Sequence, residues 1–255
     1  MKKLILLGSL FLAIFLVNTE KSYASNFSEG GVTVYKKEKI EDNQLLFERA
    51  KKGVTDKRIN NIKQKGVLNS VEKDRSIEID ILETTELLEK IIDADGNEIT
   101  SYATTYFVPI TEDDLEATAG TLAAGGTSTS GDKSDSTFSA TGITTMHYTV
   151  VTDDSGNQYY KWSRQTGTWQ ALTSGITFSN RSVKLNQLGY PIGGGGLVNP
   201  TKTESVSHSY DINVASYGWV SIFRGGSSIF GAKPKVTLTR GSSNWVFEFD
   251  HNMTF

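Results

Sequence analysis

The sequence predicts a mainly β fold, an antiparallel β-sandwich or open barrel, preceded by a short charged N-terminal segment that is helical or flexible. The chain of 255 residues contains 24 glycines and 4 prolines. This balance is typical of short strands joined by glycine-rich turns. Apolar and polar residues alternate through much of 141–255, which favours strands with one buried and one solvated face. No helical pattern separates these strands, so antiparallel pairing is expected.

The clearest pair of strands lies at the C-terminal end of the chain. Three aromatic residues, Trp245, Phe247 and Phe249, occupy every second position after a turn at 241–244. The segment before this turn alternates in the same way, so the pattern predicts a hairpin with one apolar face.

The remaining strands of a sandwich domain over 141–255 follow from the same alternation and from turn residues. We expect seven or eight strands in all. The others lie near 141–152, 158–164, 168–172, 176–186, 205–213 and 218–223, with turns at 153–157 and 165–167.

The first 24 residues have the three parts of a secretory signal peptide. Lys2 and Lys3 precede an uncharged run over 4–17, and small residues at 22 and 24 predict cleavage between Ala24 and Ser25. An uncleaved anchor is the alternative, but a bilayer span usually needs about 18 apolar residues. We therefore expect a secreted, extracellular protein, free or associated with a cell wall, with no stable membrane anchor after cleavage.

Residues 25–70 form a segment in which both signs of charge are interleaved, as on a solvated face. Helices are expected over 43–52 and 56–65, because capping residues precede them and glycines follow them. A flexible arm, a pro-segment and a docking element for the β region all stay open.

A β-hairpin region is expected over 71–110. Alternation over 77–82 indicates a strand, and 93–97 has the turn residues for a hairpin over 86–108, which Pro109 should end. Residues 111–140 are poor in bulky side chains and indicate a low-complexity loop or linker.

Composition excludes several classes of function. The chain has no cysteine and a formal net charge of −3. Disulfides and thiolate chemistry are therefore absent, and a nucleic-acid partner is not expected without a basic patch. No cofactor or metal is predicted, because 93–98 departs from the EF-hand register and the histidines form no metal-binding pair. His208 is expected to be half-buried on a strand face.

Aromatic residues give the best binding candidates. Trp162, Trp169, Tyr159 and Tyr160 lie close together in sequence, and exposed rings on a β-sandwich can stack on sugars or hold partner proteins. The alternative is that these large rings fill the core.

We therefore expect a non-enzymatic protein that binds a cell-wall polymer or a secreted or surface partner protein, with its oligomeric state undetermined. Ser/Thr alternation with apolar residues also fits a membrane-active or pore-forming β protein. A secreted hydrolase is a third alternative, since paired carboxylates serve glycoside hydrolysis. Its candidate acids are Glu204, Asp211, Glu248 and Asp250.

Overall fold

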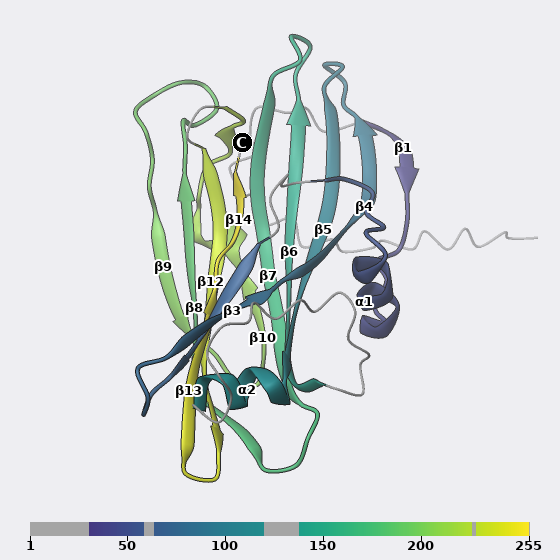
Figure 1. Ribbon diagram of the computed structural model, residues 1–255. Helices are drawn as coiled ribbons and strands as arrows, with labels where there is room; N and C mark the ends of the chain where they lie inside the picture. The colour runs from purple at the N-terminus through teal and green to yellow at the C-terminus, as the bar shows by residue number, and fades with distance from the viewer. Residues whose placement is uncertain (1–30, 59–63, 120–137, 226–227, 255) are drawn as a thin grey trace, which may run out of the picture.

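The computed structural model describes residues 31–58, 64–119, 138–225 and 228–254 (Figure 1). The expected signal peptide, the cleavage site at Ala24 and Ser25, and most of the low-complexity segment lie outside the described residues. The described chain forms two antiparallel sheets that pack face to face, so the predicted β-sandwich is confirmed.

The first sheet, sheet A, has seven strands and carries the longest hairpins. Its order is β1–β4–β5–β6–β7–β10, and β11 also pairs with β7. The bounds are β1 Val32–Lys36, β4 Leu82–Ile92, β5 Glu98–Thr111, β6 Phe138–Thr152, β7 Gln158–Ala171, β10 Ser209–Asn213 and β11 Ile222–Phe223.

The second sheet, sheet B, also has seven strands, in the order β3–β2–β13–β12–β8–β9, with β14 paired to β12. The bounds are β2 Lys65–Ser70, β3 Ser76–Asp80, β8 Ile176–Leu188, β9 Thr201–Ser205, β12 Ile229–Arg240, β13 Ser243–Phe249 and β14 His251–Thr254. Both sheets thus combine strands that precede residue 112 with strands that follow residue 137. The described parts of the N-terminal regions belong to the same sandwich as 141–255.

The first predicted helix is confirmed as α1, Asn43–Lys51, with Asp42 as N-cap. The Asp42 carboxylate accepts a hydrogen bond from the Gln44 N–H at 2.8 Å, which satisfies a donor of the first turn. Leu46 and Phe47 are buried against the outer face of sheet A, where Phe47 meets Phe107 edge-on. The helix therefore docks on the sandwich.

The prediction of a second helix over 56–65 is wrong at both ends of that range, which are the parts of it that the structure describes. Residues 56–58 are not helical, and β2 begins at Lys65. The reason is that Asp56 bonds along the edge of β4: its N–H donates to Thr85 O at 2.9 Å, and its carboxylate accepts from the Leu87 N–H at 3.0 Å. Tertiary hydrogen bonds outweigh a short, weakly apolar helical pattern here.

A helix replaces the start of the expected loop at 111–140. Helix α2 spans Glu112–Ala119, and its first turn is capped by Thr111 and Asp114, whose side chains and N–H groups bond reciprocally. Leu115 is buried, and Thr118 accepts a hydrogen bond from the Trp245 indole N–H at 2.8 Å. Helix α2 thereby covers the lower end of the sandwich in Figure 1.

Two expected chain breaks are also corrected. Pro109 does not end its strand, because it pairs with Thr141 of β6. On the other side of β5, the pairing with β4 stops at Phe107, so Pro109 needs no backbone N–H toward β4. The expected turn at 165–167 lies inside β7, because Gln165 is buried and donates to Thr144 at 2.5 Å.

The segment 205–213 is not one strand but crosses from sheet B to sheet A. It divides into the end of β9 and β10, and His208 between them is exposed, not half-buried as expected. The expected strand at 218–223 is mostly irregular: the 3₁₀ helix η3, Val214–Tyr217, precedes it, and only β11 is extended.

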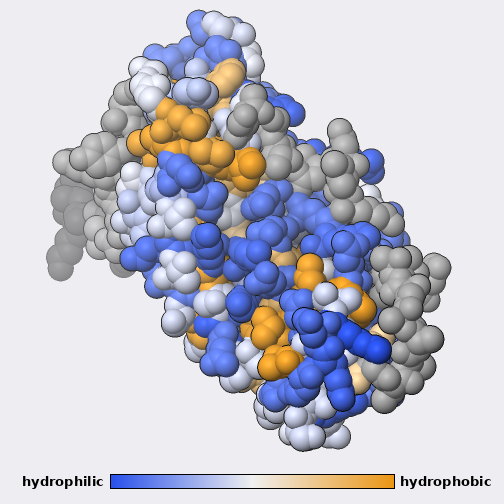
Figure 2. All heavy atoms as spheres, turned by 60° about the vertical axis from the view of Figure 1, so that its left-hand side comes forward, coloured by the Kyte–Doolittle hydropathy of each residue, from blue (hydrophilic) through white to orange (hydrophobic). Residues whose placement is uncertain are grey.

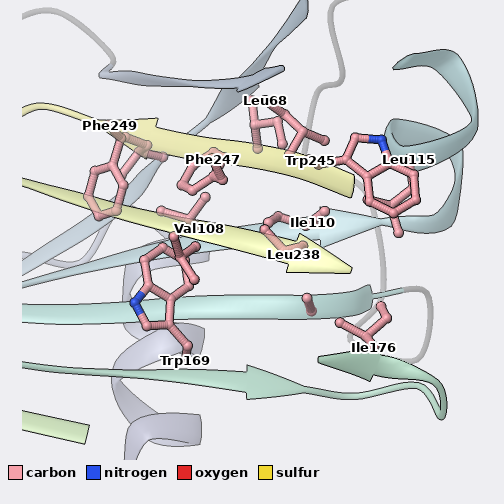
Figure 3. Close-up of a cluster of buried hydrophobic side chains, with 14 of the residues drawn as sticks. Leu68, Val108, Ile110, Leu115, Trp169, Ile176, Leu238, Trp245, Phe247 and Phe249 are labelled. Atoms are coloured by element: carbon pink, nitrogen blue, oxygen red, sulfur yellow. The ribbon is translucent and has the colours of Figure 1, made fainter. Parts of the chain in front are cut away.

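The core divides into two clusters along the sandwich. The lower one, shown in Figure 3, is almost entirely apolar and includes Trp245, Phe247 and Phe249, each at most 2% exposed. The predicted C-terminal hairpin is therefore confirmed, with its apolar face inward. The upper cluster contains more tyrosine and lies toward the β4–β5 and β6–β7 hairpins.

Candidate binding site

The structure buries three of the four aromatic residues that the sequence singled out. Trp162 and Trp169 are each 2% exposed and Tyr160 is 1% exposed, whereas Tyr159 is half-buried. The two tryptophans therefore offer no exposed platform for a ligand. They fill the core instead, which was the alternative expected from the sequence. Tyr159 contacts Phe223, with ring centroids 5.7 Å apart.

The burial of the tryptophans follows from their place on β7. This strand has neighbours on both sides, β6 on one and β10 or β11 on the other, so its inward face meets sheet B. Trp169 lies across its partner Gly142, where a Cβ atom would come within 2.5 Å of the indole. Trp162 packs on Phe230 of sheet B at 5.8 Å.

A different set of aromatic and apolar residues is exposed where the edge strands of the two sheets meet. We name this surface the aromatic edge. It consists of Tyr190, Leu197, Tyr217, Trp219 and Val220. Tyr190 is 55% exposed, Leu197 53% and Val220 37%, whereas the other two rings are half-buried.

Two chain segments form the aromatic edge: the loop between β8 and β9, and the end of η3 with the chain that follows it. Backbone hydrogen bonds hold them side by side: Phe223 N–H donates to Tyr190 O at 2.8 Å, and Ile192 N–H donates to Ser221 O at 3.0 Å. Figure 2 brings this side of the molecule forward and shows hydrophobic residues gathered on its upper part, within a mainly hydrophilic surface.

The half-buried rings of the aromatic edge are fixed from below. Tyr217 and Trp219 lie 5.5 Å apart, and Trp219 also packs edge-on against the buried Trp162 at 6.1 Å. The Tyr217 hydroxyl donates to the Glu204 carboxylate at 2.8 Å, and Lys202 Nζ lies 5.5 Å from the Tyr217 ring centroid. Burial, with Glu204 beside it, raises the pKa of Tyr217 to about 12, so the phenol stays a neutral donor.

The glycine run at 193–196 shapes the loop of the aromatic edge. Gly193, Gly194 and Gly195 all have positive φ, between 82° and 122°, a region that side chains with a Cβ rarely adopt. These glycines let the chain turn tightly between Tyr190 and Leu197. The sequence marked this run as unusual, but it did not show which side chains the loop would present.

A second group of aromatic residues, the tyrosine cluster, lies in the upper half of the sandwich. It consists of Tyr102, Tyr148 and Tyr160 on three adjacent strands of sheet A. The rings stack in a row, with centroids 5.5 Å apart for Tyr102 and Tyr148 and 6.1 Å for Tyr148 and Tyr160. Lys57 Nζ lies 4.5 Å from the Tyr102 centroid and 5.1 Å from the Tyr160 centroid.

Two ionisable groups near the inner face of sheet A have shifted pKa values: Lys57 beside the tyrosine cluster and Glu83 opposite Tyr106 on β5. Burial, with Arg224 nearby, lowers the pKa of Lys57 to about 8. Burial raises the pKa of Glu83 to about 7, against the opposing charge of Arg58. Shifted groups of this kind concentrate at functional sites, although structural sites also have them.

The turn at 93–97 is held by its own side chains. The Asp93 carboxylate accepts hydrogen bonds from the Asn97 side-chain amide at 2.9 Å and from the N–H groups of Asn97 and Asp95 at 2.8 and 3.0 Å, and these bonds lower its pKa. The carboxylate thus serves the backbone turn. Over the described ranges, no three His, Asp or Glu side chains gather in a way that could hold a metal ion.

The four acids considered for hydrolysis lie apart. Asp211 forms a bidentate pair with Arg164 on sheet A, with distances of 2.7 and 2.6 Å. Glu248 and Asp250 share Lys233 on sheet B. Glu204 accepts the hydrogen bond of Tyr217 at the rim of the aromatic edge. Only Glu248 and Asp250 are neighbours, as their sequence spacing predicted.

Comparison of the chain with protein-family models, with curated proteins and with solved structures found no match. In the described part of the chain, no helix has the length and apolar character to cross a membrane. The candidate sites therefore depend on the geometry given above, and the aromatic edge has the more exposed side chains of the two.

Proposed function

We propose that this is a secreted, non-enzymatic binding protein that recognises a carbohydrate polymer of a cell wall through its aromatic edge. The observation that carries this proposal is the exposure of Tyr190, Leu197 and Val220 beside two half-buried aromatic rings. A contiguous apolar surface rimmed by polar groups is typical of a recognition site. Export is inferred from the sequence of residues 1–24.

The chemistry of the aromatic edge suits a sugar more than a purely apolar partner. Aromatic faces can cover the C–H faces of a sugar ring, and hydroxyl groups of the sugar need donors and acceptors beside those faces. Glu204 and Lys202 supply an acceptor and donors at the rim of Tyr217. Both rim residues lie on the exposed strand β9.

The aromatic edge is also preorganised, which lowers the entropy cost of binding. Tyr217 is held by its hydrogen bond to Glu204, and Trp219 is held by its contact with Trp162. The ligand would therefore meet rings that already have their bound orientation. Such rigid aromatic anchors commonly contribute most of the affinity of a binding surface.

The other functions considered from the sequence receive less support. The Ser/Thr-rich strand β9 is a largely exposed edge of sheet B, a position in which polar side chains face water. The candidate acids for hydrolysis are mostly far apart and paired with cations. Membrane binding is kept as an outcome of the test, because exposed Leu197 and Val220 could also contact lipid.

The test is co-sedimentation of the chain 25–255 with purified Gram-positive cell wall. We expect the protein to pellet with wall, and Tyr190→Ala to weaken binding by about tenfold, the effect of losing an anchor worth about 1.4 kcal/mol. Leu172→Ala is the matched control, since Leu172 is 49% exposed but follows β7, away from the aromatic edge.

Liposomes of phosphatidylcholine with phosphatidylglycerol provide the second arm of this experiment. Pelleting with liposomes and not with wall would replace the proposal with a membrane-binding function. Equal loss of wall binding in Tyr190→Ala and Leu172→Ala would show that the aromatic edge is not the binding surface.

A further inference from the structure

We infer that the tyrosine cluster is a binding site for an organic ammonium group, which in this structure is occupied by the protein's own Lys57. The residues that carry this inference differ from those of the aromatic edge. The two proposals therefore succeed or fail independently.

The rings of the tyrosine cluster present the electron-rich surface that a cation needs. Tyr102, Tyr148 and Tyr160 form a continuous row, and adjacent ring planes are inclined by only 21° and 22°. A cation over the face of an aromatic ring is attracted by its quadrupole when it lies within about 6 Å of the centroid. Two of the three rings already hold an ammonium group at such a distance.

Lys57 shows what chemistry the site accepts. Its Nζ lies 4.5 Å and 5.1 Å from the centroids of Tyr102 and Tyr160, and it donates to the Tyr160 hydroxyl at 3.3 Å. Among the described residues, Lys57 has no carboxylate partner. The ammonium is thus held by ring faces and a hydroxyl, as an external organic cation would be.

The tyrosine cluster is held in place by hydroxyl groups. The Thr104 hydroxyl contacts those of Thr85 at 2.9 Å and Tyr148 at 3.4 Å, which links β4, β5 and β6. Burial is the main reason that the pKa values of Tyr148 and Tyr102 are raised, and Glu98 adds to the shift at Tyr102.

Cationic groups lie near the tyrosine cluster as well. Arg224 faces Tyr160 and Lys57, and Arg58 opposes Glu83. Burial and Arg224 both lower the pKa of Lys57, so the attraction of this site for an ammonium group comes from the ring faces and not from neighbouring charge. The rings of Tyr160 and Tyr102 stay neutral near pH 7, because burial raises the pKa of Tyr160 to about 12 and also raises that of Tyr102.

The resident lysine side chain can be exchanged without unfolding the sandwich. Lys57 and Tyr102 are both half-buried, so the site is reached from solvent. Lys57 belongs to an irregular segment and not to either sheet, and its flexible side chain can rotate away. An ammonium ligand would then replace one cation over the rings with another.

The experiment uses choline as the probe, titrated into the chain 25–255 and followed by NMR of ring-labelled tyrosine. We expect weak binding to the wild type, because Lys57 competes. In Lys57→Ala we expect at least tenfold tighter binding. Lys57→Arg should show no such gain, because a cationic side chain still fills the site.

Two controls separate cation recognition from simple filling of space. The neutral isostere 3,3-dimethyl-1-butanol has the shape of choline without its charge, and we expect it to bind Lys57→Ala at least tenfold more weakly than choline. Adding Tyr102→Leu to Lys57→Ala should abolish the gain. A far-UV circular dichroism spectrum like that of the wild type confirms that each variant is folded.

The inference is overturned if a folded Lys57→Ala variant binds choline no more tightly than the wild type. Equal affinity for choline and its neutral isostere would also overturn it, because attraction to the rings would then not depend on charge. Shifts confined to tyrosines outside the cluster would place the choline elsewhere.

Discussion

The two halves of this sandwich are enclosed by the same sheets but differ in chemistry. The lower half, which contains α2 and the β12–β13 hairpin, packs Trp245, Phe247 and Phe249 with aliphatic side chains. The upper half packs tyrosines instead, and it holds Lys57 beside them. The difference indicates that the lower half supplies stability, whereas the upper half maintains groups suited to recognition.

The largest expected effect is in the apolar half. Phe247 is fully buried and contacts both Trp169 and Phe249. Phe247→Ala should therefore lower the free energy of unfolding by about 3–5 kcal/mol, through lost burial and an unfilled cavity. Urea denaturation followed by tryptophan fluorescence measures this change.

The matched control for that variant is Val246→Ala on the same strand, since Val246 points to the outer face and is only half-buried. Its cost should stay below about 1 kcal/mol. Similar costs for the two variants would contradict the division between an apolar core and its surface.

The next effect concerns pH and Glu83, which lies opposite Tyr106 on β5. The Glu83 pKa rises from 4.5 to about 7 on folding, so the native state binds more protons than the unfolded state between these values. Stability should then be full below pH 4.5 and fall as pH rises toward 7, by about 3 kcal/mol from this group alone.

Comparison with Glu83→Gln isolates that contribution in denaturation curves collected from pH 4 to pH 8. The stability of the variant relative to the wild type should rise between pH 4.5 and pH 7, and the variant should be the more stable protein at pH 8. Burial lowers the pKa of His147 to about 4 and that of His251 to about 3, so both histidines change stability in the opposite direction, and the difference between the two proteins is the quantity that isolates Glu83. Parallel pH profiles for the two proteins would show that Glu83 is not the group responsible.

The smallest expected effect concerns the hydroxyl groups that support the tyrosine cluster. Thr104→Val removes a buried partner of Thr85 and Tyr148 and should cost about 1–2 kcal/mol. Replacing both threonines by valine should cost less than the sum of the single changes, because no unpaired hydroxyl then remains at Thr85. Strict additivity in a double-mutant cycle would contradict this coupling.

The parts of the fold that sequence could predict are those set by local alternation. The hairpin at 86–108 and the C-terminal hairpin satisfy both the two-residue period and turn chemistry, and both are present as β4–β5 and β12–β13. The chain breaks expected at 109 and 165–167 failed for another reason. Whether Pro109 or Gln165 interrupts a strand depends on neighbours that are distant in sequence.

The candidate sites were harder to predict for the same reason. Tyr160 was singled out, but its partners Tyr102 and Lys57 lie 58 and 103 positions earlier in the chain. In the aromatic edge, backbone hydrogen bonds join a glycine-rich loop to the chain after η3. Such bonds do not depend on side-chain identity, so the sequence does not predict them. Alternation alone did not show whether the tryptophans of β7 face the core or the solvent. Their burial depends on the strands that pair with β7 on both sides.

The most direct test of this division is one NMR experiment on the chain 25–255, titrated separately with soluble cell-wall fragments and with choline. We predict that wall fragments shift the resonances of Tyr190, Tyr217 and Trp219. Choline should shift those of the tyrosine cluster, most strongly in Lys57→Ala. The indole of Trp245 in the lower half should stay unchanged with both ligands. Shifts centred on Trp245, or no response from any residue of the upper half, would contradict the account.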